Sequence, residues 1–165
     1  MSIKIINLDY LYYGYKESLI PYYDKYFFHG NGHILNFKNA PITLFAIDYV
    51  KMGKKVLDNL DSHVFIKYEY DRYSDAESVK NDTHKYKAAQ RIIDIVDSIR
   101  KYGYCEGRYD HSRYMIRVKE GFVSSYENEP TAYGNDPNGF TLHTRKHRAA
   151  ACIALGIKEV KVKIV

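Results

Sequence analysis

The feature that most restricts the fold of this chain is a change of hydrophobic period along its C-terminal half. Apolar residues recur at helical spacing in two segments and alternate with polar residues in three others. The helical segments are Lys85–Lys101 and Arg145–Leu155, and the alternating ones are Tyr114–Val118, Phe140–His143 and Val160–Ile164. This interleaved order predicts an α/β (α+β mixed) fold rather than a helical bundle or a β-sandwich.

The helix at Lys85–Lys101 has the clearest pattern. Its apolar stripe consists of Ala89, Ile92, Ile93, Val96 and Ile99. Thr83 or Asp82 is suited to cap its start, and Gly103 is suited to end it. Between the second and third strands, Ser124–Asn138 contains two prolines and a glycine, and we predict a long loop there.

The N-terminal half is harder to assign. Pro41, after Asn39 or Ala40 as cap, predicts a helix that Gly53 ends. Val64–Tyr70 alternates like a strand, and the polar run Asp71–Thr83 is predicted to be a loop. The remaining N-terminal predictions are a short strand or turn involving Ile3, Ile5, Leu8 and Leu11, and a turn at His29–His33.

Length favours one compact unit, in which residues 1–60 form an N-terminal extension packed on a domain of residues 61–165. No apolar run is long enough for a transmembrane helix, and Met1–Lys4 does not begin a signal peptide, so we expect a cytoplasmic protein without a membrane partner. Cys105 and Cys152 form no disulfide framework, and Cys152 is predicted to be a buried, inert thiol.

The net charge of +5 favours anionic partners such as nucleotides, phosphorylated metabolites or nucleic acid. Eighteen tyrosines and no tryptophan are an unusual composition. Tyrosines between lysines can stack on bases, but half-buried tyrosines on strands and helices are the more common arrangement. Composition alone therefore does not separate these functions.

The segment with the most chemical information is the junction between the strand Phe140–His143 and the following helix. The first N–H groups of a helix lack intrahelical acceptors and attract anions. Cationic donors at the same turn would be unfavourable without a negative ligand. The segment supplies Thr144, Arg145, Lys146, His147 and Arg148. They indicate either a phosphate or carboxylate site, or side chains that face solvent or pair with Glu69 or Asp71.

Residues 146–162 read Lys-His-Arg-Ala-Ala-Ala-Cys-Ile-Ala-Leu-Gly-Ile-Lys-Glu-Val-Lys-Val, and residues 98–103 follow a Ser-Ile-x-x-x-Gly pattern. In these motifs residues 85–165 resemble the ParB/sulfiredoxin superfamily. The resemblance implies a ParB/sulfiredoxin-like fold and a nucleotide whose phosphates lie at the strand–helix junction. The N-terminal half, with Ala40-Pro41 and a strand at Tyr68–Tyr73, is also similar to ParB-like proteins associated with surface-glycan genes.

By this resemblance, His147 and Arg148 match the family's His-Arg pair and would contact phosphate oxygens. Arg145 stands at the family's glycine position, and Thr144 stands at its Asp/Asn position. Lys146 replaces the catalytic cysteine of sulfiredoxin, so that reaction is not expected. The sequence stops at Val165, where partition proteins continue into a helix-turn-helix domain, so a sliding-clamp role is not expected either.

A phosphotransferase would also need a carboxylate to orient the acceptor hydroxyl and a divalent ion such as Mg²⁺ to bridge phosphate oxygens. Glu69 and Asp71 are the candidates, on one face of the predicted strand, with Arg72 assisting the transferred phosphate. Solvent-facing charges are the alternative for each. His143 and His147 are separated by the strand–helix break, so we predict no zinc pair there.

The leading hypothesis is a nucleotide-binding, ParB-like enzyme, an ATP-dependent (or other nucleoside triphosphate-dependent) phosphotransferase acting on a small or nucleic-acid-borne hydroxyl. Two alternatives stay open. One is a non-catalytic nucleic-acid-binding or interaction protein, of phage origin for example, and the other is an accessory protein of surface-glycan synthesis. The sequence does not specify the substrate, the metal or the oligomeric state.

Overall fold

The computed structural model describes residues 2–14, 21, 30–31, 34–72, 82–104, 114–121 and 139–165. The predicted loop at Ser124–Asn138 lies outside these residues, as do positions 73–81 of the predicted polar loop and most of the turn at His29–His33.

The described strands form one mixed, seven-stranded sheet in the order β1-β7-β5-β6-β2-β4-β3. Their bounds are β1 Ile3–Asn7, β2 Leu11–Gly14, β3 Gly30–Asn31, β4 Ile34–Asn36, β5 Arg117–Glu120, β6 Phe140–Thr144 and β7 Glu159–Ile164. The pairs β2/β6 and β5/β7 are parallel, and the other four pairs are antiparallel. The mixed α/β prediction is therefore confirmed.

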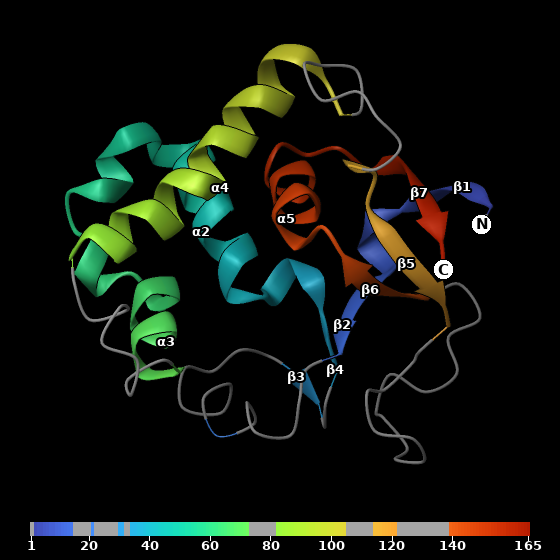
Figure 1. Cartoon of the computed structure of the whole chain (residues 1–165), viewed down its shortest axis with the longest axis horizontal. Coiled ribbons are helices and arrows are strands. Elements are labelled where there is room, and N and C mark those ends of the chain that lie inside the picture. Colours follow the sequence, from blue (N-terminus) through green and yellow to red (C-terminus); the bar gives the residue numbers. More distant parts are fainter. Residues whose placement is uncertain are drawn as a thin grey trace.

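Four described α-helices lie together on one side of this sheet, as Figure 1 shows. They are α2 (Pro41–Met52), α3 (Val64–Arg72), α4 (Asp82–Tyr102) and α5 (Lys146–Ala154), and short 3₁₀ turns include η1 (Leu8–Tyr10), η3 (Phe37–Asn39), η4 (Gly53–Leu57) and η5 (Leu60–Ser62). α5 packs against both α2 and α4. Its small side chains Ala149, Ala150, Ala151 and Cys152 are completely buried, which lets the neighbouring helices approach closely. The prediction of a buried Cys152 is confirmed.

Several predicted elements match the structure closely. α4 contains the predicted helix at Lys85–Lys101, and its stripe residues are buried in the core. α2 begins at Pro41 with Ala40 as cap and ends at Gly53, which has a φ of +65°. The predicted strands at 140–143 and 160–164 lie within β6 and β7.

The predicted strand at Val64–Tyr70 is wrong, because residues 64–72 form the helix α3. Its start is stabilised by His63, whose Nδ1 accepts a hydrogen bond from the N–H of Phe65 at 3.1 Å. Histidine is not a usual cap, so the alternating pattern of this short segment hid the helix. The strand expected at Tyr68–Tyr73 is wrong as well, because residues 68–72 belong to the same helix.

The strand predicted at Tyr114–Val118 begins later, at Arg117. The N–H of Ile116 donates instead to the hydroxyl of Tyr104 at 2.9 Å. That hydroxyl also donates to the carbonyl of Lys161 on β7 at 2.8 Å, so Tyr104 is inserted where β5 and β7 separate.

The described elements of the first 60 residues pack among those of the rest of the chain. β1 pairs with β7 at one edge of the sheet, and β2 pairs with β6 in its interior. α2 lies against α4 and α5. Within the described residues, no helix combines the length and apolarity that a bilayer span requires.

Candidate anion-binding site

The turn between β6 and α5 is built on Arg145, whose backbone is left-handed (φ 74°, ψ 40°). Among the described residues it is the only non-glycine with a positive φ. Its carbonyl accepts hydrogen bonds from the N–H groups of Arg148 and Ala149, both at 3.1 Å. A left-handed conformation is unfavourable for a residue with a Cβ, so the turn is locally strained.

Thr144, the last residue of β6, does not cap α5. The N-cap is Arg145, whose own side chain makes no capping hydrogen bond. With Arg145 at this position, Thr144 still belongs to β6 and is exposed. The positive end of the α5 dipole is therefore not compensated by the side chain of its own N-cap residue.

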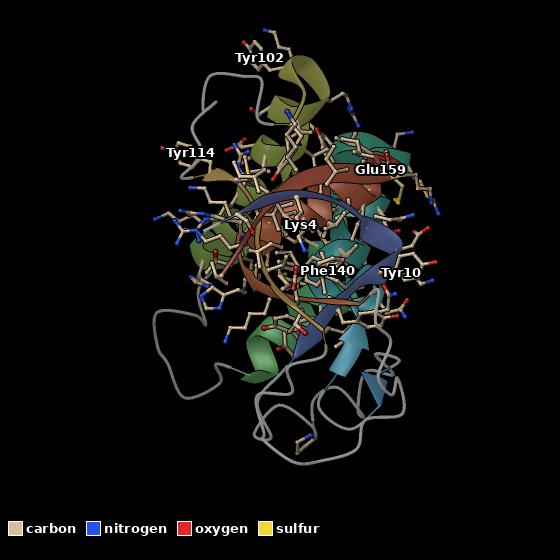
Figure 2. All side chains as sticks on the ribbon, turned by 90° about the vertical axis from the view of Figure 1, so that its right-hand side faces the viewer. Lys4, Tyr10, Tyr102, Tyr114, Phe140 and Glu159 are labelled. Carbon is tan, nitrogen blue, oxygen red and sulfur yellow. The ribbon has the colours of Figure 1, made fainter. Side chains whose placement is uncertain are left out.

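Two of the predicted arginines meet at one aromatic ring. The guanidinium carbons of Arg145 and Arg148 lie 5.8 Å and 5.5 Å from the ring centroid of Tyr114. Tyr114 comes just before β5, so this contact joins the start of α5 to the neighbouring strand. Figure 2 shows nitrogen-tipped side chains gathered below Tyr114 at one side of the molecule.

Two guanidinium groups near this turn have unused donors. Nη1 of Arg148 is buried and has no hydrogen-bond partner, and the same is true of Nε of Arg117. Arg117 is paired with Thr144 in the β5/β6 register, at an irregularity of the ladder. Neither arginine forms an ion pair with a described residue. A buried donor without an acceptor costs about 1–3 kcal/mol, so both groups favour an anionic ligand.

His147, on the first turn of α5, is half-buried. Burial, together with the positive charges of Lys146 and Arg91, lowers its pKa from 6.5 to about 4, and burial is the largest of these causes. The imidazole is therefore neutral near pH 7 and does not contribute a positive charge. It can still donate one hydrogen bond to a phosphate oxygen.

Glu69, Asp71 and Arg72 belong to α3, and their side chains lie outside the described part of the structure. The expectation that Glu69 and Asp71 share one face is wrong, because residues two apart in a helix point in different directions. α3 packs against α2 and η5. In Figure 1, α2 lies between α3 and α5.

His63 and Asp48 form a histidine–carboxylate pair with a structural role that the sequence did not reveal. Nε2 of His63 lies 2.7 Å from Oδ2 of Asp48, while Nδ1 accepts from the backbone. Both ring nitrogens are therefore used, and the His63 ring packs edge-on against Phe45 at 5.0 Å. Within the described residues, no three His, Cys, Asp or Glu side chains gather as metal ligands do.

Tyr114 and Arg117 are the site residues that sequence reasoning missed. They lie in a different strand segment from the motif at 144–148 and share no spacing pattern with it. Only the pairing of β5 with β6 brings them to the same end of the sheet.

No family model, no curated protein and no solved structure matches this chain.

Proposed function

We propose that this chain is a nucleotide-binding protein of ParB/sulfiredoxin-like fold that holds nucleotide phosphates at the β6–α5 turn. The observation that supports this most strongly is Nη1 of Arg148, a buried cationic donor without an acceptor. The left-handed backbone at Arg145 adds support, since it is the conformation that a glycine at the corresponding family position would readily adopt.

The chemistry of binding follows from the donors at the turn. The planar guanidinium of Arg148 can bind two phosphate oxygens at once, and the start of α5 adds backbone N–H groups. Neutral His147 adds a further donor. The side chain of Arg145 adds a second positive charge close to the first, since both guanidinium groups approach the ring of Tyr114.

Phosphoryl transfer to a hydroxyl is the reaction that we propose for this site. Because Glu69 and Asp71 are two positions apart on α3, only one of them is expected to act as the base. A bound Mg²⁺ would supply charge neutralisation at the phosphates. Its ligands would come from the nucleotide, water and at most one of these carboxylates.

Isothermal titration against ATP, ADP, CTP and GTP, with and without magnesium, tests the binding. We expect at least one nucleotide to bind the wild type and Arg148→Met to weaken that binding at least tenfold. Arg100→Met is the matched control, because Arg100 is an exposed arginine on α4. Loss of binding in both variants, or silence of the wild type with all four nucleotides, would refute the proposal.

Formation of the nucleoside diphosphate from the nucleotide that binds, measured with small hydroxyl compounds and with DNA or RNA as acceptors, then separates binding from catalysis. Glu69→Gln and Asp71→Asn are compared in turn, and one of the two is expected to abolish turnover while nucleotide affinity is kept. A mobility-shift assay with DNA and RNA at low salt tests the alternative of a non-catalytic nucleic-acid-binding protein. That alternative predicts a complex with nucleic acid in the absence of nucleotide.

A further inference from the structure

Among the described residues, β1 lies at the edge of the sheet and has backbone groups on its outer side that pair with no other described residue. The carbonyl of Ser2 accepts from the N–H of Ile164, and the N–H of Leu8 donates to the carbonyl of Lys158. In an antiparallel ladder, residues alternate between pointing their N–H and C=O toward and away from the partner strand. The even-numbered residues of β1 therefore face β7, and Ile3, Ile5 and Asn7 point their backbone groups outward.

The same residues carry the exposed apolar side chains of the strand. Ile3 is 55% exposed and Ile5 is 64% exposed. Figure 2 shows β1 crossing in front of the other strands, and in Figure 1 it is the outermost strand on its side. An exposed apolar edge is unusual, because edge strands normally carry charges, prolines or bulges that prevent pairing.

The one charged residue of β1 does not protect this edge. Lys4 alternates with Ile3 and Ile5, so its side chain lies on the opposite face of the sheet. There it forms an ion pair with Glu120 of β5. Both the outward hydrogen-bonding groups and the two isoleucines are therefore available to a partner.

We propose that β1 pairs antiparallel with β1 of a second copy of this chain, with Ile5 opposite Ile5 on a two-fold axis. In this register the two Ile5 residues exchange both of their outward hydrogen bonds, and Ile3 lies opposite Asn7 of the other copy. The N–H of Asn7 can donate to the carbonyl of Ile3, while the carbonyl of Asn7 already accepts at the start of η1 and can take a second bond with its other lone pair. The two sheets become continuous, and the four isoleucines form one apolar strip. A register shifted by one residue on each strand would oppose the two Lys4 residues, which is unfavourable.

The segment Ile3–Asn7 is thus complementary to itself, which is what an isologous dimer contact requires. This argues for a second copy over an unrelated strand. Each copy has a net charge of +5, so the dimer should strengthen as salt rises. The opposite salt dependence is expected for any anionic partner.

Sedimentation analysis of Ile5→Pro tests the contact. The N–H of Ile5 points away from β7, so proline removes an edge donor and leaves the β1/β7 ladder intact. We expect a wild-type dimer and a folded, monomeric variant. A wild type that stays monomeric at all accessible concentrations and salt levels, or a dimer that persists in Ile5→Pro, would overturn the proposal.

Cross-linking gives a second measurement that does not depend on tolerance of proline. In a Cys105→Ser background, Ile5→Cys places two cysteines on the axis, about 5.5 Å apart between Cα atoms, within disulfide range. Ile3→Cys is the matched control, because its two introduced thiols would be about 13 Å apart along the strands. Ile5→Cys should form a covalent dimer on oxidation and Ile3→Cys should not. Equal cross-linking of both variants would indicate random collision and contradict the register.

Discussion

Arg145 combines a backbone that favours glycine with a side chain directed to Tyr114. A left-handed backbone costs a residue with a Cβ about 1–2 kcal/mol. Glycine avoids this cost, but it also raises the entropy of the unfolded chain, which offsets part of the gain in stability. We predict that Arg145→Gly is about 1 kcal/mol more stable than Arg145→Ala in urea unfolding. Both variants lose the guanidinium, so their difference reports the backbone alone. Equal stabilities would show that the turn relaxes away from the left-handed conformation.

His147 makes stability depend on pH in a defined direction. Its pKa is about 4 in the folded chain and is expected near 6.5 in the unfolded chain. Between these values the unfolded state binds the extra proton, so acidification destabilises the fold. We predict a loss of about 2 kcal/mol from His147 between pH 8 and pH 5, measured as the wild type minus His147→Gln by urea unfolding. A difference that stays constant over this range would contradict the assignment.

At the scale of single residues, the sequence predicted one part of the candidate site and missed another. The cluster at Thr144–Arg148 was recognisable because several cations follow a strand directly, at a place where a helix begins. The neutral state of His147 was not recognisable, since it depends on burial and on Arg91 of another helix. Tyr114 and Arg117 were missed because strand pairing, not sequence spacing, brings them to the turn.

At the scale of elements, Tyr104 takes the place of a missing ladder contact between β5 and β7. Its hydroxyl accepts a hydrogen bond from the N–H of Ile116 and donates one to the carbonyl of Lys161. We predict that Tyr104→Phe lowers the free energy of unfolding by about 2 kcal/mol, because both backbone groups lose their partner. Tyr102→Phe is the control, since Tyr102 is exposed and lies two residues earlier. Equal effects of the two variants in urea unfolding would show that solvent replaces the Tyr104 hydroxyl.

The sequence predicted the type of an element correctly where its hydrophobic period extended over several turns, or where a proline or glycine marked its ends. α4 has five stripe residues, and α2 has Pro41 at its start and Gly53 at its end. The helix α3 was predicted as a strand for two reasons. Its nine residues make too few turns to show a helical period, and its cap is a histidine, which is not a usual capping residue. The start of β5 was misplaced because a distant tyrosine hydroxyl binds the N–H that a strand partner would otherwise have used.

At the scale of the whole molecule, strand order was the feature that sequence could not supply. β1 and β2 join the sheet at separate places, next to β7 and β6, and both of these strands come from the C-terminal end of the chain. Local patterns contain no information on such distant pairing. The placement of β1 at the edge and of β2 in the interior nevertheless determines which surfaces are open to partners.

Stability and the proposed function should oppose each other at Arg148. Its buried, unpaired Nη1 destabilises the empty protein, while the same donor should bind a phosphate. We predict that Arg148→Met raises the free energy of unfolding by about 1 kcal/mol, because methionine fills similar space without an unsatisfied donor. The nucleotide that binds should raise the melting temperature of the wild type but not that of the variant. Arg100 is exposed and its guanidinium carbon lies 5.9 Å from the ring centroid of Tyr49, so Arg100→Met should lower the free energy of unfolding by at most about 1 kcal/mol and leave the nucleotide effect unchanged. A fall in this control and a rise in Arg148→Met together exclude a general effect of removing one charge. A variant less stable than the wild type would mean that Arg148 stabilises the fold through its contact with Tyr114, and the site would then lose its main structural support.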